Sequence, residues 1–297
     1  MAIRIQGFAM KLKIKEFLTS PEVTSLSEET QNSYRYSLEP FRQYCSVHNI
    51  DEPTGFQEHM PKLANYMKES KKISGKSIQQ YLVIVKMFLK WSGTPVDYEY
   101  RISSEEKKAT QKKRLQRWFD EDDIRKSLAY KFSDNQPEVR IRNQLLVRLL
   151  YETGARVREL SCVKIADVDV EDGIIWLYDS KTEPRPAFFG EETKELFRQL
   201  RNFKLFWTGN IFPQEDSLKL TVSDMLKALQ MKNGKDGRGP HTFRHYLASY
   251  LFYQGDMRVE DIATLLGDTV KTIVDVYLHP TPLMLRSRVA KAMGWEE

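Results

Sequence analysis

Apolar residues at helical spacing fill the first third of the chain. One predicted helix shows this period most clearly, at Tyr34, Leu38, Phe41 and Cys45. Residues three and four positions apart share one helix face, so this side would be buried. The Ser25-x-x-Glu28 pattern just upstream predicts a capped start, and Pro40 predicts a kink within the helix.

Two more apolar faces follow in the same region. The first comes after the Pro53-Thr54-Gly55 break and consists of Leu63, Tyr66 and Met67. The second comes after Ser74-Gly75, closes at Ser92-Gly93, and consists of Ile78, Leu82, Val85 and Leu89. Short amphipathic helices separated by breakers are typical of a small bundle, so residues 12–93 are predicted to form an N-terminal helical domain.

A basic segment interrupts the apolar pattern. No apolar periodicity appears between residues 94 and 117, so we predict a linker there. From Arg101 to Arg117 the chain has seven basic residues against two acidic ones. This excess equals the net charge of +5 for the whole chain. A charged linker is often merely solvated, but so local an excess also favours an anionic partner.

The remainder, residues 118–297, mixes helical patterns with one clear β signal. The segment Val168–Tyr178 surrounds Asp172-Gly173 and predicts a hairpin, with Arg185–Phe189 as a further strand and Lys181 in the turn between them. Further helices are predicted at residues 191–203, 221–231, 241–254, 258–266, 269–277 and 283–293. The fold class is therefore mainly α with a small β-sheet, and the second domain is α+β.

Composition excludes several protein classes. Hydrophobic residues make up 41% and charged residues 29% of the chain, as in ordinary water-soluble proteins. No apolar run is long enough to span a bilayer, and charges interrupt the N-terminal segment, which argues against a signal peptide. A cytoplasmic protein without membrane contact is expected. The two cysteines, Cys45 and Cys162, are predicted to be buried free thiols.

Two cationic or titratable side chains are three positions apart at the start of a predicted helix. His241 and Arg244 would lie on one face, after Pro240 at the first turn, and could converge on one oxygen-rich group. The alternative is a purely structural role, in which His241 caps the helix and Arg244 pairs with a nearby carboxylate. Tyr277 follows at the end of a later apolar pattern.

In sequence order, Arg156, Lys181, His241, Arg244 and Tyr277 resemble the active-site series of the tyrosine recombinase (phage integrase) family, with a Xer-like arrangement. The matching stretches are Thr153-Gly154-Ala155-Arg156-Val157-Arg158-Glu159-Leu160, His241-Thr242-Phe243-Arg244-His245, and Leu265-Leu266-Gly267 followed by Tyr277-Leu278-His279. The resemblance implies a core-binding, SAM-like N-terminal domain, a catalytic domain and site-specific DNA recombination. It also implies a double-stranded DNA partner and a homo-oligomer, dimer to tetramer, on that DNA.

The side-chain chemistry suits a phosphodiester. Arg156 and Arg244 can neutralise charge on the non-bridging oxygens, while Tyr277 can attack phosphorus and later leave more easily than an alcohol. His241 can accept or return the tyrosine proton, and Lys181 can protonate the leaving 5′ oxygen. This chemistry requires neither ATP nor a metal, and the chain has no Gly-x-x-x-x-Gly-Lys-Ser/Thr loop. No cofactor is expected.

Several alternatives stay open for individual positions. Arg158 is a rival for Arg156, Lys181 could be a surface lysine, and the nucleophile has rivals in Tyr246, Tyr250 and Tyr253. The family usually has His or Trp after Leu-Gly, whereas this chain has Asp268. We expect that carboxylate to point away, bind an arginine or hold a water, since an anion beside a phosphate is unfavourable.

Other functions also stay open. A type IB topoisomerase-like nicking-closing enzyme would use the same groups, and a DNA-binding protein with a decayed site would use none of them. A metal site at His241, His245 and His279 is a weaker alternative, because the Glu of a His-Glu-x-x-His motif is missing. The last predicted helix carries Leu285, Val289 and Met293 on one face and could pack on its own domain or on a second copy.

Overall fold

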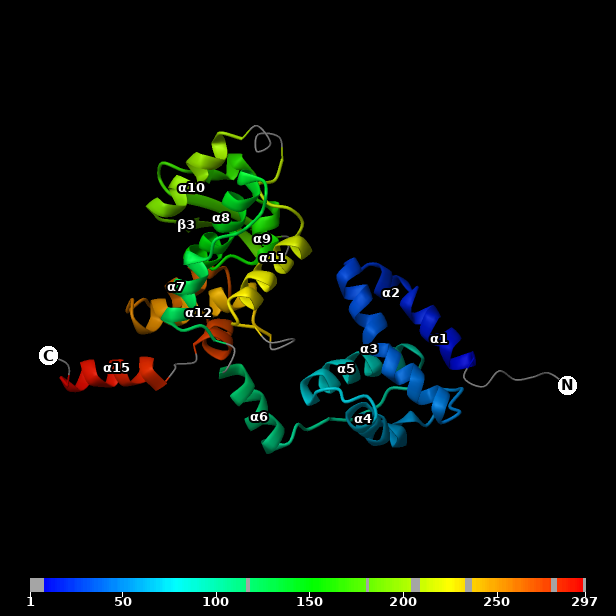
Figure 1. Cartoon of the computed structure of the whole chain (residues 1–297). Helices are drawn as coiled ribbons and strands as arrows, with labels where there is room; N and C mark the ends of the chain where they lie inside the picture. The colour runs from blue at the N-terminus through cyan, green and yellow to red at the C-terminus, as the bar shows by residue number, and fades with distance from the viewer. Residues whose placement is uncertain are drawn as a thin grey trace. The chain divides into compact units, whose positions relative to one another are not determined.

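The computed structural model describes residues 8–115, 118–179, 182–203, 209–232, 237–278 and 282–295. The chain divides into two compact units, Met1–Gln111 and Lys112–Glu297. Each unit has its own hydrophobic core, and Figure 1 labels the helices and strands of each.

The N-terminal unit is helical throughout its regular structure. Its elements are α1 (Phe8–Leu18), α2 (Pro21–Thr24), α3 (Glu28–Val47), the 3-10 helix η1 (Phe56–His59), α4 (Met60–Glu69) and α5 (Gly75–Trp91). Phe41 from α3 lies at the centre, with its ring centroid 5.0 Å from that of Phe56 and 5.5 Å from that of Phe88. Aromatic rings from three separate elements therefore tie the bundle together.

Two local predictions for this unit were wrong. The side chain of Ser27, rather than Ser25, caps α3 by accepting a hydrogen bond from the Thr30 amide. Helix α1 was missed because lysines interrupt its sequence, yet Met10, Ile14 and Phe17 keep the spacing of one helix face and all three are buried. Pro40 lies inside α3, which continues through it to Val47.

The predicted linker contains a helix, α6 (Ser104–Leu115). A reciprocal cap starts it: the Ser103 amide donates to the Glu106 carboxylate, and the Glu106 amide donates to the Ser103 hydroxyl. Apolar periodicity failed to predict α6 because good helix formers such as Glu, Lys, Ala and Gln need no buried face. The boundary between the two units falls within this helix.

The C-terminal unit surrounds a small sheet with helices. In chain order its elements are α7 (Glu121–Ala129), α8 (Pro137–Thr153), α9 (Val157–Cys162), η2 (Ile165–Asp167), β1 (Val168–Asp169), β2 (Ile174–Asp179), β3 (Thr182–Phe188), α10 (Glu191–Arg201), α11 (Glu215–Ala228), α12 (Pro240–Tyr253), α13 (Val259–Leu266), α14 (Val270–Thr272), the π-helix η4 (Ile273–Tyr277) and α15 (Pro282–Met293). The predicted hairpin and most predicted helices are present, although α11 begins six residues before its expected start.

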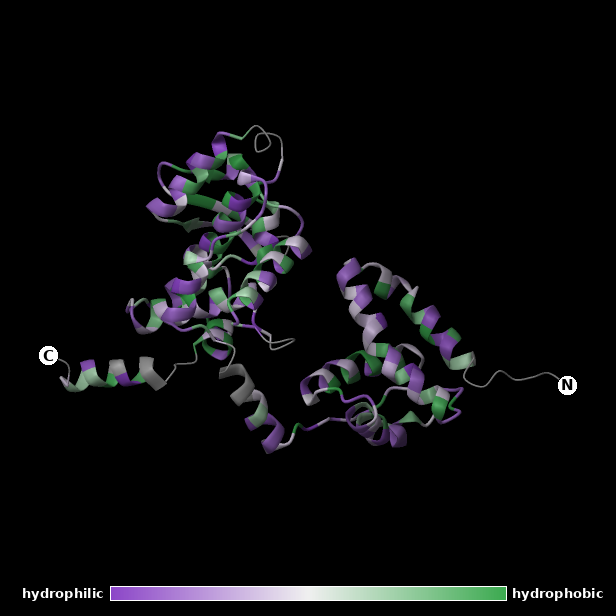
Figure 2. Ribbon diagram, viewed as in Figure 1, coloured by the Kyte–Doolittle hydropathy of each residue, from purple (hydrophilic) through white to green (hydrophobic). Residues whose placement is uncertain are grey.

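The sheet is antiparallel in the order β1-β2-β3. Ile175 pairs with Ala187 and Leu177 with Arg185, so these four positions share one face. That face is buried, whereas Trp176 and Phe188 on the other face are exposed. Figure 2 shows hydrophobic residues along the strands and the helices packed around them.

Helix α8 runs through the middle of this unit and contacts both α10 and α12. A second, smaller cluster joins α12, α13 and η4 through Leu247, Ile262, Leu266 and Ile273. Because α8 and η4 both pack on α12, residues far apart in sequence meet around this helix. That packing positions the candidate site.

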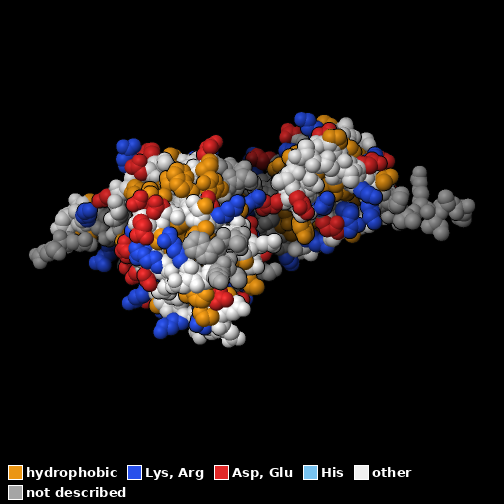
Figure 3. Space-filling model, turned by 90° about the horizontal axis from the view of Figure 1, so that it is seen from above, with side chains coloured by type: hydrophobic (Ala, Val, Ile, Leu, Met, Phe, Trp, Pro, Cys, Tyr) orange, Lys and Arg blue, Asp and Glu red, His pale blue; other side chains and the backbone are white. Residues whose placement is uncertain are grey.

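The surface mixes charges of both signs. Figure 3 shows Lys and Arg interspersed with Asp and Glu, and hydrophobic patches between them. Cys45 is buried, and burial raises the pKa of its thiol to about 12. Cys162 is exposed, contrary to prediction, because it lies on the solvent side at the end of α9. Within the described part of the chain, no helix has the length and apolar character needed to cross a membrane.

Candidate active site

Arg244 is the centre of the candidate site. It lies in the second turn of α12, and its side chain is 0% exposed. Its guanidinium donates to the carbonyl oxygens of Gly154 (Nη1, 2.8 Å) and Leu266 (Nη2, 2.6 Å), and to the Asp268 carboxylate (Nη2, 2.9 Å). Its Nε donates to the Tyr277 hydroxyl at 3.1 Å. Four partner residues therefore fix one cation in place.

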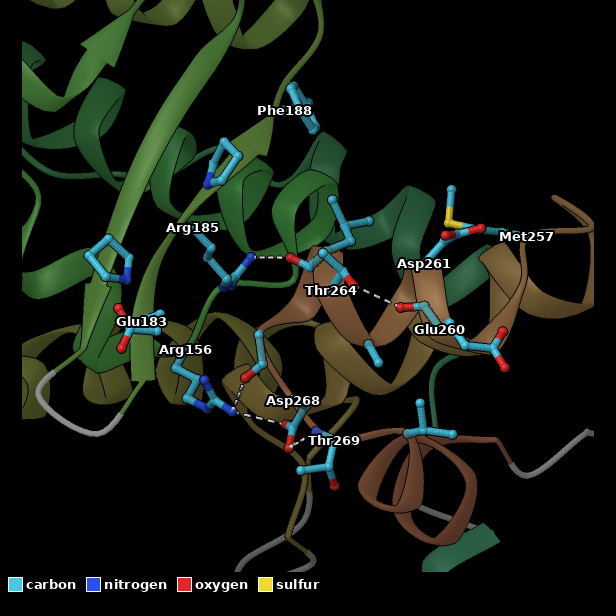
Figure 4. A pocket seen from close by; sticks show the side chains of 16 residues that line it. Arg156, Glu183, Arg185, Phe188, Met257, Glu260, Asp261, Thr264, Asp268 and Thr269 are labelled. Atoms are coloured by element: carbon cyan, nitrogen blue, oxygen red, sulfur yellow. Dashed lines mark hydrogen bonds and ion pairs between the residues drawn. The ribbon is translucent and has the colours of Figure 1, made fainter.

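Arg156 reaches the same point from another direction. It precedes α9, directly after the turn in which Gly154 has φ 58°. Its Nη2 donates to the Gly267 carbonyl at 3.2 Å and to Asp268 Oδ2 at 2.9 Å. This is the same carboxylate oxygen that Arg244 contacts, so two guanidiniums converge on one oxygen atom. Figure 4 shows Arg156 and Asp268 facing each other beside the pocket.

Glu159 accepts hydrogen bonds from two of the arginines, Arg156 and Arg185. It is 1% exposed and accepts from the Arg156 amide (2.6 Å) and from Arg156 Nη1 (3.3 Å). It also accepts from Arg185 at Nε (3.4 Å) and Nη2 (3.0 Å). Burial lowers the pKa of Arg185, and the charge of Glu159 opposes that shift. Glu159 therefore orients both arginines.

Arg185 was missed as a member of the site. The sequence placed it in a strand, where an arginine usually faces solvent. Its Nη1 donates to the carbonyl of Leu265, which ties β3 to α13. A usable signal was present, because strand alternation puts Arg185 on the same side as Ala187, which is an inward position. A charged residue at an inward position indicates a buried counter-charge.

Tyr277 ends the π-helix η4, and 7% of it is exposed. Its ring centroid lies 5.4 Å from the Arg244 guanidinium carbon and 4.7 Å from the ring centroid of His245. The Ser249 hydroxyl donates to the Tyr277 carbonyl at 2.8 Å. Hydrogen bonds at both ends of the residue thus anchor the segment to α12. π-turns occur often at functional sites.

His241 lies one turn before Arg244 on α12. Desolvation lowers its pKa, and repulsion by Arg244 and Arg156 adds to the shift. His241 is exposed, so solvent limits the desolvation and the two positive neighbours matter more. Their influence places His241 in the field of the arginine pair. A lowered pKa means that the ring is neutral at pH 7.

Lys181 lies outside the described residues. The strands on either side of it end at Asp179 and begin at Thr182.

The rival residues lie in other environments. Arg158 is exposed, whereas Arg156 belongs to the cluster. Tyr246 is buried in the main core, and burial raises the pKa of its hydroxyl well above the ordinary value. Tyr250 stacks on Tyr246, with ring centroids 5.8 Å apart. Of the four candidate tyrosines, Tyr277 is the one with a hydrogen bond to Arg244.

A pocket of about 1190 Å³ adjoins the arginines. Arg156, Arg185 and Asp268 lie on its wall, together with apolar residues such as Pro186, Phe188 and Met257. Among the described residues, no three His, Cys, Asp or Glu side chains are grouped as metal ligands. His279, the third member of the metal alternative, lies outside those residues.

The chain is similar in sequence to known proteins. Residues 117–284 match the sequence profile of the Phage integrase family. The tyrosine recombinase XerA of Saccharolobus solfataricus is 32% identical over 233 residues, which cover 76% of this chain and 71% of that protein. XerA of Pyrococcus furiosus is 28% identical over 287 residues, covering 94% and 93%.

The fold has solved counterparts. The crystal structure of the XerH site-specific recombinase bound to palindromic difH substrate, a post-cleavage complex, aligns with a TM-score of 0.68 and 17% identity. The alignment covers 96% of this chain and 84% of XerH. At this identity the likeness concerns the fold, and it confirms the predicted fold class. On the sequence match over more than half its length, the chain belongs to the phage integrase family.

Proposed function

We propose that this protein is a site-specific DNA recombinase that cuts and rejoins strands through a 3′-phosphotyrosyl intermediate. One observation carries the proposal: Arg244 donates both to the Tyr277 hydroxyl and to an oxygen that it shares with Arg156. This arrangement supports Tyr277 as a nucleophile beside an anion site built from two cations. The activity of the XerA relatives supports the same conclusion.

The covalent step follows from this arrangement. The Tyr277 oxygen attacks the scissile phosphorus, and the bond from phosphorus to the 5′ oxygen breaks. Arg156 and Arg244 donate to the non-bridging oxygens, where charge gathers in the transition state. Loss of one such donor typically costs about 3–4 kcal/mol, or roughly 100- to 1000-fold in rate. Rejoining is the reverse attack by a 5′ hydroxyl on the phosphotyrosine.

Two proton transfers complete the reaction. We assign His241 to accept the tyrosine proton, since its lowered pKa keeps the ring neutral and able to act as a base. We assign Lys181 to donate a proton to the leaving 5′ oxygen, a role that requires a flexible cation near the phosphate. No cofactor has a part in these steps.

Double-stranded DNA is the proposed partner. The solved XerH complex contains difH substrate, and basic residues are concentrated on α6 in this chain, at Lys107 and Lys108 among others. Phosphate contacts by such residues give affinity that falls steeply with salt. A DNA substrate agrees with a cytoplasmic location.

A second copy of the chain is the proposed protein partner. Helix α15 contacts α12, and Lys291 pairs with Asp256 at 3.2 Å. Leu285, Val289 and Met293 nevertheless remain 50%, 40% and 62% exposed. An apolar row of this kind suits docking on another protomer. Removing residues 282–297 should reduce the oligomers seen by size exclusion on target DNA, and unchanged oligomers would exclude this role.

Covalent capture of nicked DNA tests the catalytic proposal. The substrate is a pool of duplexes with randomised flanks and a nick that lets the short 5′-hydroxyl fragment diffuse away, with the 5′ end of the cut strand labelled. We expect a denaturant-resistant adduct with the parent and none with Tyr277→Phe. Tyr250→Phe is the matched control, because Tyr250 lies on α12, where its ring stacks on Tyr246, and the loss of its hydroxyl should leave the adduct unchanged.

Covalent capture together with relaxation of supercoiled DNA separates the alternatives. DNA binding without an adduct from the parent would indicate a binding protein with a decayed site. Relaxation of supercoiled DNA without joint molecules would indicate a type IB topoisomerase-like enzyme. An adduct from Tyr277→Phe would contradict the assignment of the nucleophile.

A further inference from the structure

Asp268 occupies an unusual position for a carboxylate in a site that binds phosphate. Its Oδ2 lies 2.9 Å from Arg156 Nη2 and 2.9 Å from Arg244 Nη2. A non-bridging phosphate oxygen held by both guanidiniums would need the same two donors. The carboxylate and the phosphate oxygen therefore compete for one set of hydrogen bonds.

Charge makes this competition strong. The buried cluster holds three guanidiniums, from Arg156, Arg185 and Arg244, against the carboxylates of Glu159 and Asp268. With both carboxylates present, one positive charge remains. Once Asp268 is withdrawn, two remain, and the cluster can offset the two negative charges of a pentacoordinate transition state.

Of the two carboxylates, Asp268 is the one whose side chain can move away from the arginines. Glu159 is 1% exposed and accepts hydrogen bonds from three groups of Arg156 and Arg185, besides the Arg156 amide. Asp268 is 14% exposed. Within the described part of the chain, its carboxylate accepts one hydrogen bond besides those from the arginines, at 3.3 Å from the Thr269 amide. It also borders the pocket of about 1190 Å³, which offers its side chain open space.

Asp268 is linked to the nucleophile through the chain. Gly267, at φ 61°, ends α13, and the Asp268 amide donates to the Ala263 carbonyl at 3.0 Å. From Asp268 the chain passes through the short helix α14 into the π-turn that ends at Tyr277. The carboxylate thus holds the arginines from the same segment that carries the tyrosine.

We propose that Asp268 is an internal competitor of the scissile phosphate: its carboxylate holds the Arg156–Arg244 anion site in the DNA-free protein and must be displaced by the phosphodiester. This inference rests on the proposed function and adds a control of phosphate affinity at the same site. The apparent affinity for phosphate equals the intrinsic affinity multiplied by the fraction of time that the carboxylate leaves the site open. A carboxylate in place nine-tenths of the time weakens phosphate binding about tenfold.

Titration with inorganic phosphate tests the competition without knowledge of the DNA target. The measurement is isothermal calorimetry at constant ionic strength, on the full chain. We expect Asp268→Asn, which keeps the shape but loses the charge, to bind phosphate at least about tenfold more tightly than the parent. Asp261 is an exposed residue on the wall of the same pocket and pairs with Arg258 at 4.0 Å rather than with the active-site arginines. Asp261→Asn therefore removes one charge without touching them and should match the parent. Arg156→Gln in the Asp268→Asn background should abolish the gain.

The opposite results would overturn the proposal. If Asp268 merely supports the arginines, Asp268→Asn will bind phosphate equally or more weakly. Asp268→Ser is the second variant if the amide disturbs folding, which circular dichroism would reveal, and the same tightening is expected. The adduct assay separates this proposal from the proposed function. If Asp268→Asn binds phosphate more tightly but the parent forms no adduct, Asp268 is a competitor and the protein is not a recombinase. If the parent forms an adduct but Asp268→Asn binds phosphate with unchanged affinity, the protein is a recombinase and Asp268 is not a competitor.

Discussion

Removing the charge of Glu159 should lower the free energy of unfolding of the C-terminal unit by more than most single substitutions do. Glu159→Gln keeps the size of the side chain but leaves Arg185, whose side chain is 6% exposed, without its counter-charge. The loss of one partner from a buried pair typically costs about 3–5 kcal/mol, because the remaining charge stays desolvated. We therefore expect the free energy of unfolding to fall by about 3 kcal/mol or more.

The assay is urea unfolding followed by tryptophan fluorescence. Four of the five tryptophans lie in the C-terminal unit, so this signal reports mainly on it. A double-mutant cycle with Arg185→Met separates the pair from other effects, and we expect the double variant to be about 1–3 kcal/mol more stable than the two single losses would add up to. A cost below about 1 kcal/mol for Glu159→Gln, or simple additivity in the cycle, would refute the reasoning.

Two further predictions concern the neighbouring residues. Gly267→Ala should lower the free energy of unfolding by about 1–2 kcal/mol or more in the same urea assay, because its φ is 61° and a Cβ would lie 2.6 Å from Arg185 Cδ; an unchanged midpoint would contradict that backbone conformation. His241→Asn should reduce the stability lost on acidification. The folded-state pKa of His241 lies below its ordinary 6.5, so the unfolded chain binds the proton more readily and stability falls as the pH drops below about 6.5. Urea midpoints at pH 7.5 and 5.5 check this, and an equal loss in parent and variant would argue against the shift.

Periodicity predicted the buried helices well and the exposed ones poorly. The face of α3 and that of α5 show clear apolar spacing, and both are buried. Helix α6 has no such face, so its cap and helix-forming composition were the available signals. The amphipathic spacing of α1 was hidden by its lysines, although Met10, Ile14 and Phe17 were in register.

Motif order predicted which residues to examine, but not how they meet. The i, i+3 spacing placed His241 and Arg244 on one helix face, whereas the convergence of Arg156 with Arg244 depends on contacts across 90 to 112 residues of chain. Such contacts are set by tertiary packing. The open question at Asp268 had three answers, and the structure selects arginine binding.

The central claim is that the Tyr277 oxygen becomes covalently joined to DNA. The most direct measurement is mass spectrometry of the trapped adduct after digestion with nuclease and protease. The account predicts a peptide containing Tyr277 whose phenolic oxygen carries a 3′-linked nucleotide. A nucleotide attached to any other residue would contradict this claim. A trapped complex in which no peptide carries a nucleotide would contradict it as well.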